Sequence, residues 1–147
     1  MFPLRILIVD SNIEFLESAA HLLMLQPNVQ IVYYAVSESD ALEQLPLLNP
    51  NLVLANWNLS DSTGLTLTRL LKNRPCPPHV VLLSLVDLPI YHTVAKEAGA
   101  DGLICTIDWN VGLFKLLQEI DPSPQDLAVP LESQPLERAD AVKTGEA

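Results

Sequence analysis

The chain is poor in the residues that mark several large classes of protein. Its 147 residues include two cysteines, Cys76 and Cys105, too few and too far apart in sequence for a disulfide framework or a zinc ribbon. Its five glycines form neither a Gly-x-Gly-x-x-Gly motif nor a P-loop, which excludes nucleotide binding through those motifs. No apolar run approaches the roughly 18 residues that a membrane-spanning helix needs, so we expect no contact with a membrane.

Basic residues are scarce as well. Eight lysines and arginines stand against 18 aspartates and glutamates, which gives a formal net charge of -10. Because this charge repels a phosphate backbone, we expect no nucleic-acid binding by this chain alone. Residues 1–5 lead into a short apolar run without a small-residue cleavage site, and we therefore expect a cytoplasmic protein.

Apolar residues make up 49% of the chain, enough to fill a single hydrophobic core at this length. Residues 1–120 alternate short β-branched or leucine-rich runs with longer segments of helical period, which is typical of a parallel α/β sheet. We predict strands at 5–9, 30–35, 51–55, 79–84 and 102–105 and helices at 12–26, 38–48, 64–73, 88–98 and 109–120. The runs at 5–9, 51–55 and 79–84 are nearly continuous in apolar residues, so we expect them at the centre of the sheet.

The first predicted helix combines an amphipathic pattern with a capping motif. Its apolar positions share one face, which we expect to pack on the sheet: Leu16, Ala19, Ala20 and Leu23. Ser11 followed by Glu14 fits a capping box, in which the hydroxyl accepts a backbone N–H of the first turn and the glutamate reaches back. We therefore predict Ser11 as the helix cap.

The composition changes after residue 120. Residues 121–147 contain four prolines and six acids but only two bases and few large apolar residues. Such a segment buries too little surface to offset the entropy of ordering it. We therefore predict one folded domain over 1–120 and a flexible acidic tail over 121–147.

Polar residues gather where the predicted strands end. Asp10 and Ser11 follow the first strand, Asn56 follows the third, Ser84 ends the fourth and Thr106 follows the fifth. The carboxyl ends of parallel strands converge on a crevice at the point where the strand order reverses, and function concentrates there. We therefore expect these five side chains to form any functional site.

The same positions carry a resemblance to a known family. Residues 4–120 resemble the receiver domain of two-component response regulators, through four blocks in the right order and spacing: LIVDSN at 7–12, PNLVLANWNL at 50–59 followed by Gly64, VVLLS at 80–84 and AGADGL at 98–103. The resemblance implies a flavodoxin-like receiver fold: a doubly wound, five-stranded parallel sheet of the (βα)5 type with strand order 2-1-3-4-5.

The resemblance also shows what this chain has replaced. In the family, two acids after the first strand and an aspartate after the third hold Mg²⁺, and that aspartate accepts a phosphoryl group; here the three residues are Asp10, Ser11 and Asn56. An amide oxygen brings no negative charge, and it is no phosphoryl nucleophile. With its partners gone, we interpret Asp10 as a turn residue rather than as a weak magnesium ligand, and we expect no metal.

The residues that read out phosphorylation in the family are also changed. The lysine that pairs with the phosphoryl oxygens falls on Thr106, and the aromatic switch residue falls on Leu103. Only Ser84 survives from the switch pair. The resemblance therefore implies an atypical receiver, often called a pseudo-receiver, that is independent of phosphorylation.

The first functional hypothesis is a non-enzymatic signalling module without a cofactor, which acts by contact with another protein such as a histidine kinase or an output protein. In receivers the usual contact surface is formed by the fourth helix, fifth strand and fifth helix, and a homodimer through this face is one option. The candidate contact residues, which include a tryptophan beside Asn56, are Trp57, Tyr91, His92, Lys96, Trp109 and Lys115.

Three alternatives concern the same crevice. Asp61, between Ser60 and Ser62, is the one acid that could act as a displaced phosphoacceptor, although its setting indicates an exposed turn acid. The chain could instead be a small-ligand sensor on a flavodoxin-like scaffold. Finally, Asn56 could hydrogen-bond Ser84, Thr106 or the backbone and so hold the crevice in one state, or it could be an ordinary loop amide with its hydrogen bonds satisfied locally.

Overall fold

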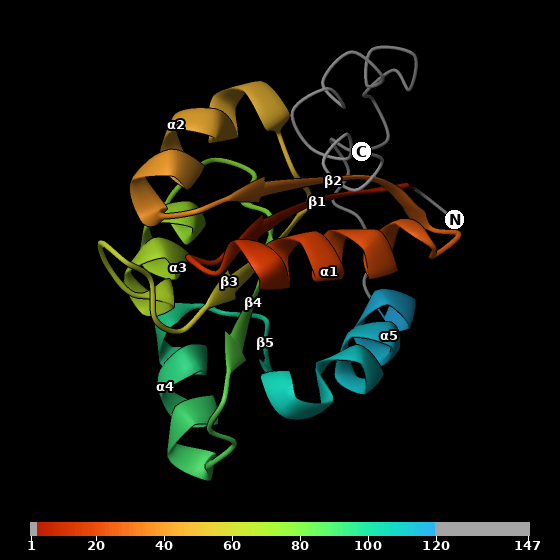
Figure 1. Ribbon diagram of the computed structural model, residues 1–147. Helices are drawn as coiled ribbons and strands as arrows, with labels where there is room; N and C mark the ends of the chain where they lie inside the picture. The colour runs from red at the N-terminus through yellow and green to blue at the C-terminus, as the bar shows by residue number, and fades with distance from the viewer. Residues whose placement is uncertain (1–2, 120–147) are drawn as a thin grey trace.

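The computed structural model describes residues 3–119, and the predicted tail at 121–147 lies outside them. The alternation of five strands with five helices is confirmed (Figure 1). The elements are β1 (Leu4–Val9), α1 (Ile13–Met24), β2 (Val29–Ala35), α2 (Glu38–Leu48), β3 (Leu52–Asn56), α3 (Gly64–Lys72), β4 (His79–Ser84), α4 (Pro89–Ala98), β5 (Gly102–Cys105), a short 3-10 turn (Thr106–Asp108) and α5 (Trp109–Glu119). Within the described residues, no helix has the length and apolar content that a membrane span requires.

The strands form one parallel sheet in the order β2-β1-β3-β4-β5, which is the predicted doubly wound topology. The three strands expected at the centre, β1, β3 and β4, are the central ones. Alternate residues of each strand feed two separate cores. Leu7 and Val9 join the core under α2, α3 and α4, whereas Ile6 and Ile8 join the core under α1 and α5 (Figure 1). Helices therefore cover both faces of the sheet, which explains the continuous apolar runs.

The start of α1 corrects one prediction. The apolar face of this helix is buried as expected: Leu16, Ala19, Ala20 and Leu23. The cap, however, is Asn12 and not Ser11, because the Asn12 side chain accepts the backbone N–H of Phe15. The Asp10 carboxylate in turn accepts the N–H of Asn12 at 2.8 Å, which holds the turn one residue further along. Ser11 is left exposed.

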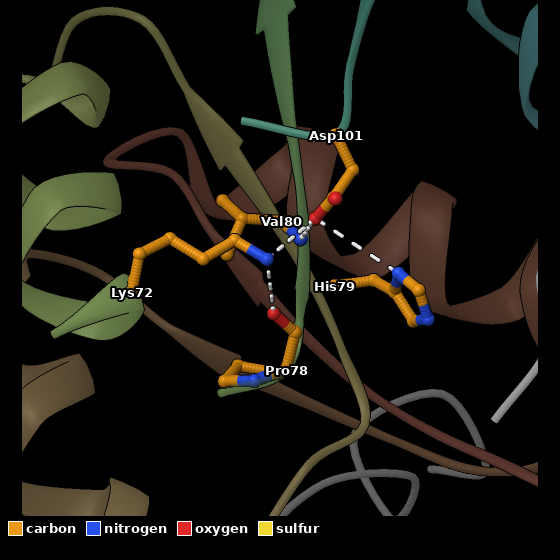
Figure 2. A network of polar contacts seen from close by, with 5 residues as sticks. All are labelled: Lys72, Pro78, His79, Val80 and Asp101. Atoms are coloured by element: carbon orange, nitrogen blue, oxygen red, sulfur yellow. Dashed lines mark hydrogen bonds and ion pairs between the residues drawn. The ribbon is translucent and has the colours of Figure 1, made fainter. Parts of the chain in front are cut away.

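The amino edge of the sheet is held by a polar network around Asp101 (Figure 2). One oxygen of this carboxylate accepts the Val80 backbone N–H at 2.8 Å and the Lys72 ammonium at 2.7 Å. Lys72 also donates to the Pro78 carbonyl at 2.9 Å, and the His79 ring lies 3.9 Å from the same carboxylate oxygen. The network joins the end of α3 to the beginnings of β4 and β5 (Figure 2). The candidate crevice lies at the other ends of these strands.

Candidate functional site at the carboxyl edge of the sheet

Asp10 and Asn56 are in direct contact where β1 and β3 end. The Asn56 side-chain amide donates to the Asp10 carboxylate at 2.8 Å, and its oxygen accepts the backbone N–H of Asn58 at 2.8 Å. These two partners fix the orientation of the amide, because a backbone N–H needs an oxygen and a carboxylate needs a donor. Of the partners weighed for Asn56, the backbone is confirmed. The predicted hydrogen bonds from Asn56 to Ser84 or Thr106 are wrong, and the hydrogen bond to Asp10 was not predicted.

This arrangement leaves a divalent cation poorly served. Asp10 is only 5% exposed, and each of its two oxygens already accepts an N–H, one from Asn12 and one from Asn56. Magnesium prefers an octahedron of oxygen ligands, but the amide presents its nitrogen to this carboxylate. Among the described residues, no group of three or more histidines, cysteines, aspartates or glutamates is placed to hold a metal. The residues present therefore do not fit the magnesium site of the family.

The two hydroxyl residues of the crevice are occupied by local contacts. The Ser84 hydroxyl accepts the backbone N–H of Val86 at 3.0 Å and so shapes the loop that follows β4. The Thr106 hydroxyl lies 3.4 Å from the Ser84 carbonyl, which is longer than an ordinary O–H···O hydrogen bond. Thr106 therefore lies beside Ser84 through the Ser84 backbone carbonyl and not through its hydroxyl. Within the described chain, no hydrogen bond joins either residue to Asn56.

Two aromatic residues lie beside the crevice. The rings of Trp57, directly after β3, and Tyr91, on α4, have centroids 4.6 Å apart with an interplanar angle of 41°. Trp57 is held at both ends of its backbone, since its N–H donates to Leu83 and its carbonyl accepts from Gly64. Leu103, on β5, is half-buried and packs, like Trp57, against the core under α2, α3 and α4. The aromatic contact therefore joins the loop after β3 to α4, whereas position 103 on β5 holds a leucine.

Asp61 is bound to the beginning of α2. Its exposed carboxylate accepts the backbone N–H groups of Glu38 at 2.9 Å and Ser39 at 3.0 Å, the first two residues of α2. These two donors, Glu38 first, lower the pKa of Asp61 below its ordinary value. Together with Ser37, which accepts the N–H of Asp40, Asp61 caps the first turn of α2 from the loop after β3. The sequence indicated the exposure of Asp61 but not this contact.

The predicted contact residues fall into two groups. Lys96 and Lys115 are exposed on α4 and α5, and His92 is exposed on α4 but bonded to Asp87. Trp109 instead packs against Phe15 of α1, with ring centroids 5.5 Å apart, and joins the core under α1 and α5. Trp109 is therefore a half-buried core residue and contributes less to an outer face than the sequence indicated.

Comparison with known proteins agrees with the fold. The response regulator receiver domain family matches residues 6–105. The transcriptional regulatory protein DegU of Brevibacillus brevis is 28% identical over 101 residues, which cover 69% of this chain and 43% of that protein. The sensory transduction protein LytT of Bacillus cereus is 31% identical over 84 residues, which cover 57% of this chain and 34% of that protein. The chain thus spans less than half the length of these curated relatives.

Solved receiver structures show the same fold. The signal receiver domain of NarL from Mycobacterium tuberculosis aligns with a TM-score of 0.68 at 20% identity, over 82% of this chain and 100% of that one. The BeF3-activated receiver domain of RstA from Klebsiella pneumoniae aligns with a TM-score of 0.70 at 26% identity, over 77% of this chain and 94% of that one. Because the family match covers more than half of the sequence, this chain belongs to the response regulator receiver domain family.

Proposed function

We infer that this chain is a receiver of two-component signal transduction that works without phosphorylation and acts by contact with other proteins. The observation that carries this inference is the hydrogen bond from Asn56 to Asp10. Phosphoryl transfer to a receiver needs a carboxylate nucleophile and positive charge around the transferred group. Here an amide stands at the acceptor position, and its N–H group satisfies the remaining acid.

The surroundings of the crevice support the same inference. Position 106 holds a threonine, whose hydroxyl is directed to the Ser84 carbonyl and carries no charge toward a phosphoryl oxygen. The rings of Trp57 and Tyr91 hold the loop after β3 against α4. We therefore propose one constitutive conformation, with no catalytic residue and no cofactor, in a cytoplasmic protein whose output is binding to a partner such as a histidine kinase or an output protein.

The contacts of Asp61 weaken the case for a displaced phosphoacceptor. Both of its oxygens accept N–H groups from the first turn of α2, and the positive end of the helix dipole stabilises its negative charge. Attack on a phosphoryl donor would break these bonds and leave two N–H groups of the helix unpaired. Asp61 is therefore assigned to positioning the loop against α2.

The test is phosphorylation by a small donor. The chain is incubated with acetyl phosphate and Mg²⁺, and its intact mass is recorded under acidic conditions; the RstA receiver domain, known in a BeF3-activated form, serves as the positive control. We expect no phosphoryl adduct on this chain. An adduct that persists in Asn56→Ala but disappears in Asp61→Asn would establish the displaced acceptor and overturn the proposal.

A homodimer through α4, β5 and α5 is a second mode of contact that the exposed residues Lys96 and Lys115 permit. Sedimentation velocity of the whole chain over a range of concentrations measures it directly. If phosphorylation is absent and the chain stays monomeric, a separate protein partner is the remaining output.

A further inference from the structure

Among the described residues, β5 is an edge strand of the sheet. β5 pairs with β4 on one side, and within the described residues no strand pairs with its other side. The Asp101 N–H donates to the Val80 carbonyl of the β4 side at 2.7 Å. Since successive residues of a strand direct their backbone groups to opposite sides, the N–H and carbonyl groups of Gly102 and Ile104 face outward. Such an edge is a template for another strand.

Hollows lie on both faces of this edge. The first, of about 360 Å³, lies between β5 and α4 and includes Ala95, Lys96 and Ala100. The second, of about 440 Å³, lies between β5 and α5 and includes Val111, Lys115 and Leu116. Gly102 and Leu103 line both hollows, which therefore meet across β5. Because the side chains of an added strand alternate between the two faces of a sheet, the hollows offer space for both sets.

Two lysines and two acids line the hollows beside the edge of β5. Lys96 stands in one hollow and Lys115 in the other, and among residues 3–119 neither has an ion-pair or hydrogen-bond partner. Asp87 lines one hollow and Asp101 lines both; Asp87 contacts the His92 ring, and Asp101 is paired with the Lys72 ammonium. In a chain with a net charge of -10, this leaves two free positive groups flanking a strand edge.

We propose that the edge of β5 accepts an extended acidic segment of a partner protein as an added strand. The outward N–H and carbonyl groups of Gly102 and Ile104 supply the backbone hydrogen bonds, and Lys96 and Lys115 select carboxylates on the two faces of the incoming strand. Two consecutive acids meet this requirement, because neighbouring residues point to opposite faces. The inference rests on the proposed function in that it assigns a partner to the same output.

The probe is a fluorescein-labelled, acetylated peptide of sequence Ser-Val-Glu-Glu-Val-Ser, titrated against the whole chain by fluorescence anisotropy. Two further versions carry backbone N-methyl groups on alternate residues, one version for each set. N-methylation removes a donor but keeps the side chains, so we expect only the version methylated on the set that faces β5 to lose binding. Equal binding by both methylated versions, or no binding by the parent peptide, overturns the proposal.

Charge reversal tests the lysines. We expect Lys96→Glu and Lys115→Glu each to lower the affinity for the peptide by about three- to tenfold. Arg69→Glu, at an exposed base on α3, makes the same change in net charge and is expected to leave the affinity unchanged. Circular dichroism confirms that each variant is folded. If neither lysine variant weakens binding, the charge selection is wrong.

Two other outcomes are separable. If the chain self-associates in sedimentation velocity and the lysine variants abolish that association, the edge belongs to a second copy and the proposal fails. If the peptide does not bind while acetyl phosphate still yields no adduct, strand addition fails alone and the phosphorylation-independent receiver stands. If a phosphoryl adduct forms and the peptide still binds normally, the phosphorylation-independent receiver fails and strand addition stands.

Discussion

The side-chain amide of Asn56 donates a 2.8 Å hydrogen bond to the carboxylate of Asp10, across the carboxyl ends of β3 and β1. The contact joins two of the three residues that fall on the acidic positions of the family, and it satisfies the one carboxylate among them. The amide N–H thus supplies a hydrogen-bond partner for a buried carboxylate. Without such a partner, the removal of this carboxylate from water would destabilise the folded protein.

Restoring a carboxylate at position 56 tests this contact. Asn56→Asp places two acids side by side, so we expect the free energy of unfolding to fall by about 1–3 kcal/mol without a cation. Added Mg²⁺ should recover part of the loss by binding weakly between them. Thermal denaturation with and without Mg²⁺ measures both effects, and Asn58→Asp, at an exposed position of the same loop, is the control. Phosphorylation by acetyl phosphate should stay poor without a lysine at position 106; efficient phosphorylation would contradict this.

The cap that Asp61 forms on α2 has a predictable pH dependence. Its pKa is lowered in the folded protein by the N–H groups of Glu38 and Ser39. Its contribution to stability is therefore complete above the ordinary pKa of an aspartate, about 3.9, and is lost as the pH falls through the lowered value. We expect Asp61→Asn to lower the melting temperature at pH 7, with the difference from the unmodified chain shrinking at acid pH. Glu43→Gln, at an exposed acid of α2, should show no such trend; a constant difference for Asp61→Asn would refute the cap.

The contact between Trp57 and Tyr91 should appear as a coupling energy. Aromatic pairs in contact contribute about 0.5–1.5 kcal/mol beyond the burial of their surface. In a double-mutant cycle of Trp57→Leu and Tyr91→Leu, we expect a coupling of this size in the free energy of unfolding by urea. The cycle of Trp57→Leu with Phe15→Leu should be additive, because Phe15 packs with Trp109 on the other face of the sheet. Additivity in both cycles would contradict the link between the loop and α4.

Gly64 is required by the space beside Asn56. A Cβ atom at this position would lie 2.5 Å from the Asn56 carbonyl oxygen and 2.7 Å from the Leu82 side chain. We expect Gly64→Ala to lower the free energy of unfolding by about 1–3 kcal/mol and to disturb the crevice. In Gly102→Ala the nearest atom would be 3.8 Å away, an ordinary contact, so this variant is the control. Urea denaturation compares the stabilities of the two variants. Equal stabilities would show that the atoms around Gly64 move apart to accommodate the added Cβ.

The Asp101 network should depend on its acid more than on its base. Asp101→Ala removes the acceptor of the Val80 backbone N–H, and we expect a loss of about 1–3 kcal/mol. Lys72→Ala leaves that hydrogen bond intact and removes a partly exposed ion pair, so its cost should stay below about 1 kcal/mol. Thermal denaturation of both variants decides the order, and a larger cost for Lys72→Ala would reverse the assignment.

The sequence predicted the fold nearly to the residue because the fold depends on local patterns. The bounds of all five strands differ by at most one residue from the prediction, since continuous apolar runs mark strands that are covered on both faces. The cap of α1 was misplaced by one residue. The Asp10 carboxylate binds the Asn12 N–H, and a capping pattern alone does not contain that contact.

The candidate site was predicted in its location but not in its contacts. The strand ends placed Asp10 and Asn56 together, yet the choice of hydrogen-bond partners depends on how an amide turns in three dimensions. Asp61 binds Glu38 and Ser39, from which it is separated by 23 and 22 positions in the sequence. No local sequence signal connects a loop acid with a helix N-terminus that far away. The open edge of β5 likewise depends on strand order and on what covers the last strand.

The Asp101 network has a consequence for protein engineering. It binds the beginnings of β4 and β5, whereas the crevice lies at the far end of β4, six residues or roughly 20 Å along the strand. Effects of substitutions that share no partners and lie this far apart add independently. Designed substitutions at Asn56 or Thr106 therefore leave the Asp101 network unchanged. The same domain can be used to compare engineered variants of the crevice.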